Sequence, residues 1–281
     1  MREIQASVIT DAVEKLCMDA AYYLPEDVKT ALQERQAQEE SEIGKYILNE
    51  VCENFKVAAE EQMPLCQDTG TALFIIEMGQ ELVVTGGGMV EAINEGVRRG
   101  YTNGYLRKSM VAEPIFERVN TKDNTPAVIH TEITEGDGLK ITLLPKGGGA
   151  ENCSAVKMLR PADGLQGVMD FVVETVDAAG GKPCPPVIVG VGVGGTADYA
   201  AYLSKKALNR EIGAHNPNPN YAKMETELLE RINKLGVGPQ GLGGVTTALA
   251  VNVEYFPCHI ASLPVFVTMN CHSQRHKSIE L

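Results

Sequence analysis

Short apolar segments bounded by glycine or proline alternate with amphipathic segments along most of this chain. The segments "GTALFIIEMG", "LVVTGGG", "PPVIVGVGVGG" and "LPVFVTMNC" are apolar runs of the length of a buried strand. The segments "LQGVMDFVVETVDAAGG", "TADYAAYLSKKAL" and "YAKMETELLERINKLG" repeat apolar residues at three- and four-residue steps, which predicts helices. Because each kind of element needs the apolar face of the other, the alternation predicts an α/β fold.

The first 62 residues have a different pattern, in which helical periodicity continues without a strand. Pro25 marks the start of a second helix in this helical N-terminal region. Two α/β lobes with mixed sheets are expected to follow, at residues 63–160 and 161–281. Within the first lobe, "AVIHTEIT" and "LKITLLPKGGG" are interpreted as a strand pair around the turn at residues 135–138.

The charge balance excludes two classes of partner. The chain has 37 acidic and 25 basic side chains and a net charge of -12, so a general attraction to nucleic acid or anionic membranes is not expected. No apolar run reaches the length of a membrane span, and the N-terminus lacks the continuous apolar centre of a signal peptide. We therefore interpret the protein as cytoplasmic. Because the net charge is negative, any anionic ligand would need locally placed cations.

The chain has seven cysteines, an odd number that argues against a disulfide framework in a cytoplasmic protein. Cys66, Cys184 and Cys271 each lie where a turn meets a predicted strand, so a rigid element can direct the thiolate. Their wide spacing matches no compact zinc or ferredoxin motif, and spacing alone favours three buried small side chains. Cys17 and Cys52 occupy helical positions among apolar residues and are expected to pack; Cys153 and Cys258 are not assigned.

Polar groups near these cysteines suit a small dicarboxylate. Gln67, Asp68, Arg107, Lys146 and His259 supply hydrogen-bond donors, positive charge and acid/base groups, and we expect them at the same strand ends. Asp68, Arg107 and His259 each have a simpler interpretation as well. Asp68 followed by Thr and Gly is typical of a turn cap, an arginine is usually solvated on a helix face, and a histidine can be satisfied at a strand edge.

Two glycine-rich loops offer backbone N–H groups. "KGGG" at residues 146–149 allows close approach of an anion, although a plain tight turn has the same sequence. "GVGVGG" at residues 190–195 satisfies the dinucleotide fingerprint G-x-G-x-x-G. The acidic residue expected about 20 residues later would be Glu211, where no strand is readable. We therefore interpret these glycines as sites of close backbone packing, with a dinucleotide-binding dehydrogenase as the distant alternative.

The segments "PLCQDTGTALF", "TGGG", "YLRKSM", "KGGGAENCSAVKML", "KPCPPVIVGVGVGGTAD" and "CHIASLPVFVTMNC" resemble the iron–sulfur-dependent class I fumarases and the similar L-tartrate dehydratases. The resemblance runs from about residue 50 to the end and is to the alpha subunit of the two-subunit form. In that family three cysteines hold a 4Fe–4S cluster with one open iron, and the resemblance places these ligands at Cys66, Cys184 and Cys271.

The resemblance also implies roles for other residues. By this resemblance, Asp68 and His259 match the family's catalytic positions. Gln67, Arg107 and Gly148 match its substrate-binding positions. The implied function is reversible hydration of fumarate to (S)-malate, with L-tartrate dehydration as the alternative. A third alternative is a non-catalytic iron–sulfur or redox-sensing module, which would need the cysteines but not Gln67, Asp68 and His259.

The two-subunit form also implies a partner. In such enzymes a beta subunit supplies a lysine and other carboxylate-binding groups of the active site. We therefore expect this chain alone to be inactive or nearly so, and the complete enzyme to be an α2β2 assembly. The open iron further implies sensitivity to oxygen.

Overall fold

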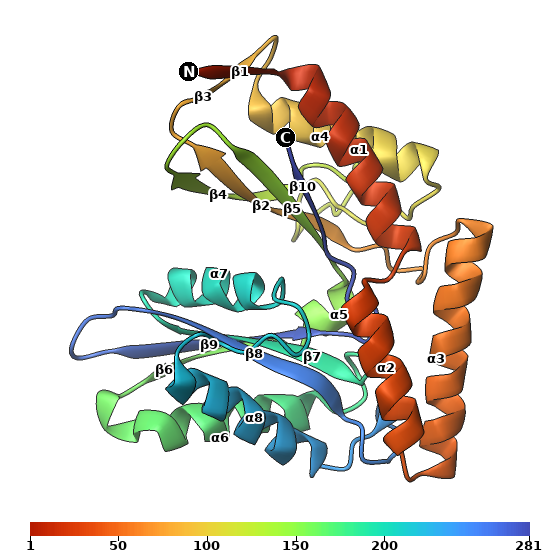
Figure 1. The fold of residues 1–281 in the computed structure, drawn as a ribbon, viewed down its shortest axis with the longest axis vertical. Coiled ribbons are helices and arrows are strands. Elements are labelled where there is room, and N and C mark those ends of the chain that lie inside the picture. Colours follow the sequence, from red (N-terminus) through yellow and green to blue (C-terminus); the bar gives the residue numbers. More distant parts are fainter. The chain divides into compact units, whose positions relative to one another are not determined.

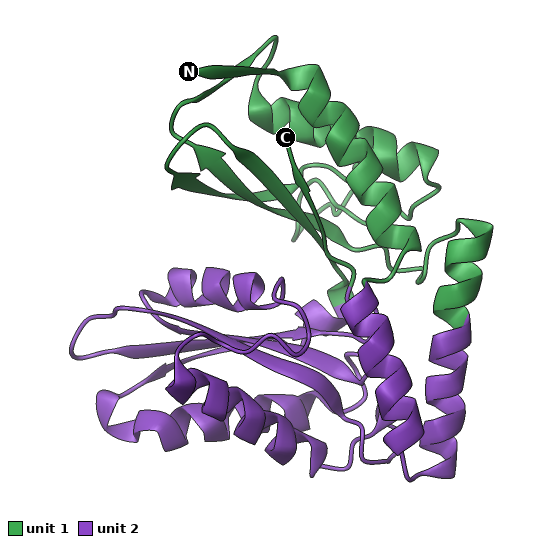
Figure 2. Ribbon diagram, viewed as in Figure 1, with its two compact units in different colours: residues 1–25, 54–148, 275–281 green, residues 26–53, 149–274 purple.

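The computed structural model describes residues 1–281, which form two compact units coloured separately in Figure 2. Unit 1 contains residues 1–25, 54–148 and 275–281, and unit 2 contains residues 26–53 and 149–274. Neither unit is one continuous segment of the chain. The sequence suggested successive segments instead, but here the helical N-terminal region is shared between the units because its helices pack on different sheets.

Unit 1 is built mainly from strands, with two long helices labelled in Figure 1. Its elements are β1 (Arg2–Gln5), α1 (Ala6–Tyr22), β2 (Thr71–Gly79), β3 (Leu82–Thr85), α4 (Met89–Asn103), β4 (Val128–Thr134), β5 (Leu139–Lys146) and β10 (Lys277–Glu280). Helix α3 (Glu42–Glu61) begins in unit 2 and ends in unit 1. Together with α2 (Glu26–Gln38), helices α1 and α3 confirm the helical character of the N-terminal region, apart from the short strand β1.

The main sheet of unit 1 has the strand order β10-β5-β2-β4. Strand β2 pairs with β5 antiparallel and with β4 parallel, so it lies between the two strands that the sequence suggested as a pair. That expected hairpin is wrong. The reason is burial: β2 presents an uninterrupted run of five buried residues and takes a central position, whereas β4 is mostly exposed and takes the edge.

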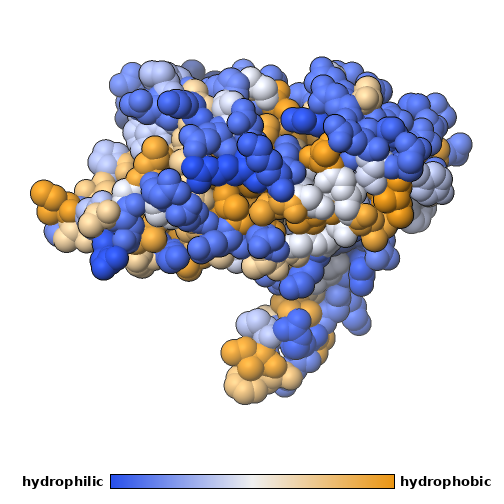
Figure 3. All heavy atoms as spheres, turned by 90° about the horizontal axis from the view of Figure 1, so that it is seen from below, coloured by the Kyte–Doolittle hydropathy of each residue, from blue (hydrophilic) through white to orange (hydrophobic).

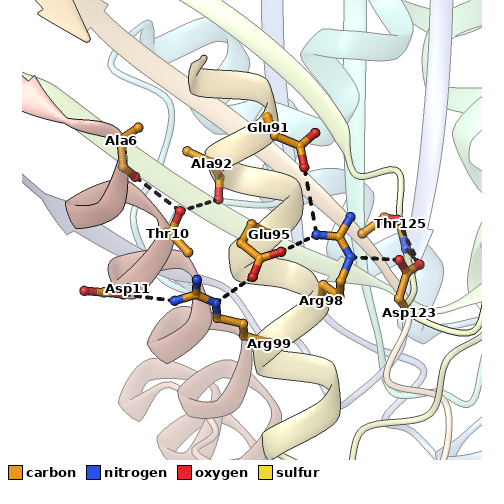
Figure 4. A network of polar contacts seen from close by, with 10 residues as sticks. All are labelled: Ala6, Thr10, Asp11, Glu91, Ala92, Glu95, Arg98, Arg99, Asp123 and Thr125. Atoms are coloured by element: carbon orange, nitrogen blue, oxygen red, sulfur yellow. Dashed lines mark hydrogen bonds and ion pairs between the residues drawn. The ribbon is translucent and has the colours of Figure 1, made fainter. Parts of the chain in front are cut away.

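Helices α1 and α4 pack closely beside this sheet. Ile9, Val13, Leu16 and Ala20 recur at helical spacing and are all buried in α1. Two glycines of α4 make the close approach possible, since a Cβ at Gly96 would lie 2.6 Å from the Cβ of Val13. Thr10 adds a polar link, because its hydroxyl donates to the Ala92 carbonyl at 3.0 Å (Figure 4).

Ion pairs on α4 extend this packing to the loop after it. Arg99 bridges Asp11 of α1 and Glu95 of its own helix, as Figure 4 shows. Arg98 contacts Glu95 and donates through Nε to Asp123 at 3.0 Å. Asp123 in turn accepts from the main chain and hydroxyl of Thr125. The loop at residues 123–125 is thereby fixed to α4.

Unit 2 is a second α/β structure. Its elements are α2 (Glu26–Gln38), α5 (Gly148–Glu151), β6 (Ala155–Leu159), the 3₁₀ turn η1 (Pro161–Asp163), α6 (Gly164–Ala179), β7 (Val187–Gly194), α7 (Ala197–Ala207), α8 (Pro219–Asn233), η2 (Pro239–Gly241), β8 (Ala248–Phe256) and β9 (Leu263–Asn270). The sheet order is β6-β9-β7-β8, with β7 and β8 parallel and the other pairs antiparallel. Helix α7 covers one face, and α6 and α8 cover the other (Figure 1).

Strand β7 is buried along its whole length. Its glycines allow α7 to lie against the strand backbone, since a Cβ at Gly192 would lie 2.0 Å from the Ala200 carbonyl oxygen. A Cβ at Gly190 would similarly lie 2.1 Å from the Ser204 carbonyl oxygen. Both glycines are thus inside the strand rather than in a phosphate-binding turn, which supports the packing interpretation of "GVGVGG" and disfavours the dehydrogenase alternative.

Together the two mixed sheets and their covering helices confirm the expected α/β fold class. No helix combines the length and the apolar character needed to cross a membrane. The face of the molecule in Figure 3 is mixed, with hydrophilic and hydrophobic residues next to one another.

Candidate functional site

The loop before β2 carries three of the predicted site residues. Gln67 is exposed, whereas Cys66 and Asp68 are half-buried. The loop is attached to α1 at its start, where the N–H of Leu65 donates to the Ala21 carbonyl at 2.9 Å. The side chains of this loop are therefore presented by a segment that is fixed at the point where it leaves the helical region.

Buried side chains fix the same loop at its other end. The Tyr101 hydroxyl donates to the carbonyls of Thr69 and Gly70, at 3.0 Å in each case. The Asn124 amide also donates to the Gly70 carbonyl, at 3.1 Å, and accepts from the Ser109 N–H. The fixed loop at residues 123–125 and helix α4 thus hold the 66–70 loop in place.

Asp68 connects this loop to the "KGGG" loop. One carboxylate oxygen accepts from the Gly70 N–H at 3.1 Å, and the other accepts from the Gly148 N–H at 2.8 Å. The first contact is the turn cap that the simpler interpretation of Asp68 described, while the second places Gly148 beside Asp68. The structure therefore brings Cys66, Gln67, Asp68 and Gly148 together within unit 1.

Arg107 belongs to the same group through its main chain. The Thr69 hydroxyl donates to the Arg107 carbonyl at 2.9 Å, and the Arg107 side chain is exposed. Lys146 lies at the start of the glycine loop and is only 4% exposed, with Nζ 3.4 Å from the Gly147 carbonyl oxygen. Both residues thus belong to segments that contact the 66–70 loop or the strand after it, Arg107 through its carbonyl and Lys146 through its pairing with Thr71.

In unit 2 the structure brings Cys184 and Cys271 to one end of the sheet. Cys184 precedes β7, and Cys271 follows the neighbouring antiparallel strand β9. The N–H of His272 donates to the Cys184 carbonyl at 3.3 Å, and the His272 ring Nδ1 lies 2.9 Å from the same oxygen. Cys184 is exposed and has a positive φ of 56°, a conformation that is costly for a residue with a side chain.

His259 lies at the opposite end of this sheet. It is in the turn between β8 and β9, where the Gly195 N–H donates to the Pro257 carbonyl at 3.2 Å. Most of strand β7 separates that turn from Cys184, a distance of roughly 20 Å. Within unit 2, His259 therefore does not share a strand end with Cys184 and Cys271, because β8 and β9 join at the far end.

A main-chain contact of His259 indicates which ring nitrogen carries the proton in its neutral form. Its Nδ1 accepts from the Ala261 N–H at 3.1 Å, so in the neutral ring the proton is on the exposed Nε2. The residue lines a hollow of about 460 Å³ together with Asp198, Tyr199 and Cys258. His259 can therefore donate from Nε2 to a group outside unit 2.

The remaining cysteines have different environments. Cys17 and Cys52 are buried, as the helical pattern predicted. Burial raises the pKa of Cys17 far above that of a free thiol. Within each unit, no three His, Cys, Asp or Glu side chains form a group that could hold a metal ion.

The sequence did not point to three residues that hold the 66–70 loop of unit 1 in place. Tyr101 and Asn124 are far from the 66–70 loop in sequence and resemble ordinary helix and loop residues. Arg275 is buried and donates through Nη2 to the Asp68 carbonyl at 2.8 Å. The sequence offered one indication of a role for Arg275, its position four residues after Cys271. It gave no indication that the side chain is buried.

Comparison with known proteins shows the family to which the chain belongs. The profile of the family described as "Fumarate hydratase (Fumerase)" matches residues 10–280. The chain belongs to this family. It is 46% identical over 275 residues to a Methanocaldococcus jannaschii protein named as an L(+)-tartrate dehydratase subunit alpha, with 95% of each chain covered. It is also 33% identical over 275 residues to the L(+)-tartrate dehydratase subunit alpha of Escherichia coli K12, covering 96% of this chain and 90% of the relative.

Membership of the fumarate hydratase family confirms the resemblance drawn from the cysteine and glycine motifs. It identifies the chain as a lyase of the fumarase and tartrate dehydratase type. Each unit thus contains candidate site residues of its own: the loops at residues 66–70 and 146–148 in unit 1, and the pair Cys184 and Cys271 in unit 2.

Proposed function

We propose that this chain is the alpha subunit of a hydro-lyase that reversibly hydrates fumarate to (S)-malate. The observation that carries the proposal is the meeting of Cys184 and Cys271 at one sheet end, in a chain of the fumarate hydratase family. Unit 1 adds a preorganised loop with Cys66, Gln67 and Asp68, which is fixed by buried hydrogen bonds.

The donor set fits a 4Fe–4S cluster bound by Cys66, Cys184 and Cys271. These three thiols are half-buried or exposed, whereas Cys17 and Cys52 are enclosed by apolar side chains. Bound by three thiolates, such a cluster would leave one iron to act as a Lewis acid toward a hydroxyl and a carboxylate.

Residues of unit 1 would bind and orient the acid. Gln67 is exposed and can donate its amide N–H groups to a carboxylate, and Arg107 offers an exposed positive charge. Gly148 can present its main chain closely because it has no side chain. Asp68 already accepts two main-chain N–H groups, so its geometry favours orienting the two loops over direct proton transfer.

His259 would act on the site of a second alpha chain. Within its own unit it is roughly 20 Å from Cys184, too far to contact an acid bound beside that cysteine. An α2β2 assembly contains two alpha chains, so each His259 could donate its Nε2 proton to the other site. Mixing Cys184→Ser and His259→Asn chains tests this, since a hybrid has one site with both residues and recovers part of the activity.

L-tartrate is the second candidate substrate. The specific observation in its favour is that the similar proteins are named L(+)-tartrate dehydratase subunit alpha. Fumarate and tartrate differ in hydroxylation, so the choice depends on donors that face the second carbon of the acid.

The same names support a beta subunit as partner, because an alpha subunit implies a second kind of chain. The beta subunit would complete the carboxylate-binding groups. Purified alpha chain with reconstituted iron and sulfide should then show little or no turnover. Full activity without a partner would contradict this part of the proposal.

The central experiment is anaerobic purification of the alpha chain with its beta partner, followed by iron and sulfide analysis and assays with fumarate and L-tartrate. Cys184→Ser and Cys271→Ser should each lose the cluster and turnover, whereas Cys153→Ser, at a half-buried thiol outside the proposed ligand set, should keep both and is the matched control. Unchanged iron content in both variants, or full activity after aeration and chelation, would refute the cluster.

A further inference from the structure

Arg275 is a buried cation with unsatisfied donors. The residue is 2% exposed, and its Nη2 donates to the Asp68 carbonyl at 2.8 Å. The other two guanidinium nitrogens, Nε and Nη1, are buried without a hydrogen-bond partner. Such a group is costly, because a buried charge is normally paired or hydrogen-bonded.

Two other cations with little solvent exposure form ion pairs. Arg210, whose side chain is 15% exposed, forms ion pairs with Glu225 and Glu254. Lys205 forms an ion pair with Glu151. Arg275 has no carboxylate partner, although the chain contains 37 acidic residues. The missing countercharge is therefore specific to the place where Arg275 lies.

That place is the 66–70 loop. Asp68 is its only carboxylate, and both oxygens accept main-chain N–H groups. Arg275 forms no ion pair with that carboxylate and contacts only the Asp68 carbonyl, so its positive charge stays unneutralised beside the loop although the net charge of the chain is -12. In a low-dielectric setting an unneutralised positive charge favours a bound anion.

We propose that Arg275 is a positioning residue that makes the 66–70 loop an anion-binding loop. It fixes the main chain of Asp68 through Nη2 and supplies the buried positive charge that balances a dicarboxylate bound at Gln67 and Gly148. Because Nε and Nη1 are buried, Arg275 acts through the loop and its electric field rather than by touching the acid. The identity of the anion rests on the proposed function, whereas the sign of its charge rests on Arg275.

The test separates the charge from the hydrogen bond. Arg275→Gln retains an amide donor for the Asp68 carbonyl but removes the charge, and Arg275→Lys retains the charge. The matched control is Arg118→Met, which removes an exposed positive charge from the same unit. Binding of succinate, which cannot be hydrated, and of its neutral analogue succinamide is measured by calorimetry on the full chain, alone and with its beta partner.

We expect wild type, Arg275→Lys and Arg118→Met to bind succinate in preference to succinamide. Arg275→Gln should bind succinate about tenfold more weakly, as expected for loss of a nearby buried charge. Without ligand, Arg275→Gln should unfold at the same temperature as wild type or higher, because an unpaired buried charge is gone. In the complex, iron and sulfide content should be unchanged, and KM should rise more than kcat falls.

Three results would overturn the assignment. One is equal succinate affinity of Arg275→Gln and wild type, and another is failure of wild type to discriminate succinate from succinamide. The third is unfolding of Arg275→Gln at lower temperature or its failure to fold, which would make the charge structural. Binding is measured without turnover, so a complex that hydrates neither candidate substrate but binds succinate through Arg275 would refute the proposed function alone.

Discussion

Glu39 shows how a single buried carboxylate fixes a loop of this protein. It is 2% exposed and accepts N–H groups from Glu40 and Ser41 in its own turn, at 3.0 and 3.1 Å. It also accepts from Val245 and Thr246, at 3.0 and 2.9 Å. Burial alone would raise the pKa of Glu39, but these hydrogen bonds, with Val245 foremost, lower it overall. The turn between α2 and α3 is thereby attached to the segment before β8.

We predict that Glu39→Gln lowers the free energy of unfolding by about 2 kcal/mol at neutral pH, because charge-assisted hydrogen bonds become neutral or are lost. The lowered pKa makes the Glu39 contribution present above its unfolded value of about 4.3 and lost as pH falls through the folded pKa. The difference between wild type and variant should therefore shrink in acid. Urea unfolding at several pH values checks this, with the exposed Glu40→Gln as control; a difference independent of pH would contradict it.

Thiol chemistry gives a second prediction for single residues. Burial raises the pKa of the Cys17 thiol, and the thiolate is the reactive form. Cys258 is exposed. In the native chain at pH 8, iodoacetamide should modify Cys258 rapidly and Cys17 only after unfolding, as peptide mass spectrometry can follow. Equal rates at the two positions would show that the α1–α4 packing opens readily.

At the scale of elements, the contact between α7 and β7 depends on the absence of side chains. A Cβ at Gly192 would lie 2.0 Å from a main-chain oxygen of α7, closer than any real Cβ contact. We predict that Gly192→Ala lowers the free energy of unfolding by about 3 kcal/mol, the upper range for overpacking. Gly138→Ala is the control, because a Cβ there meets nothing within 4 Å.

Thermal or urea unfolding measures both glycine variants. A stable Gly192→Ala chain would mean that α7 can move away from the sheet, and would reopen the dinucleotide interpretation of "GVGVGG". Nicotinamide binding by the wild-type chain, measured by calorimetry, tests that interpretation directly.

At the scale of the whole molecule, both units are made from separated segments. Strand β10 from the C-terminal residues pairs with β5, and the Arg2 guanidinium donates to the Leu281 carbonyl at 2.8 Å. We predict that the fragments 1–148 and 149–281 do not fold alone, because the first lacks β10 and the second lacks α2. Circular dichroism and cooperative unfolding measure this, with the full chain as reference; a fragment that unfolds cooperatively would contradict it.

Much of the local structure was predictable from residues alone. The helical periodicity of α6, α7 and α8 and the apolar runs of β2, β7 and β9 each predict an element from its own residues. The pairing of the strands was harder to predict. Strands β4 and β5 are joined by a short turn, yet β2 from an earlier part of the chain lies between them, since its buried residues need neighbours on both sides.

The sequence by itself determined the α/β class, the helices and strands, and, through the cysteine and glycine motifs, the family. Only the tertiary structure decided that Cys184 and Cys271 meet while His259 lies at the other end of their sheet, and that Arg275 is buried against Asp68 without a countercharge. The physical reason is that periodicity and turn chemistry are local, whereas strand order and burial depend on contacts between residues far apart in the chain.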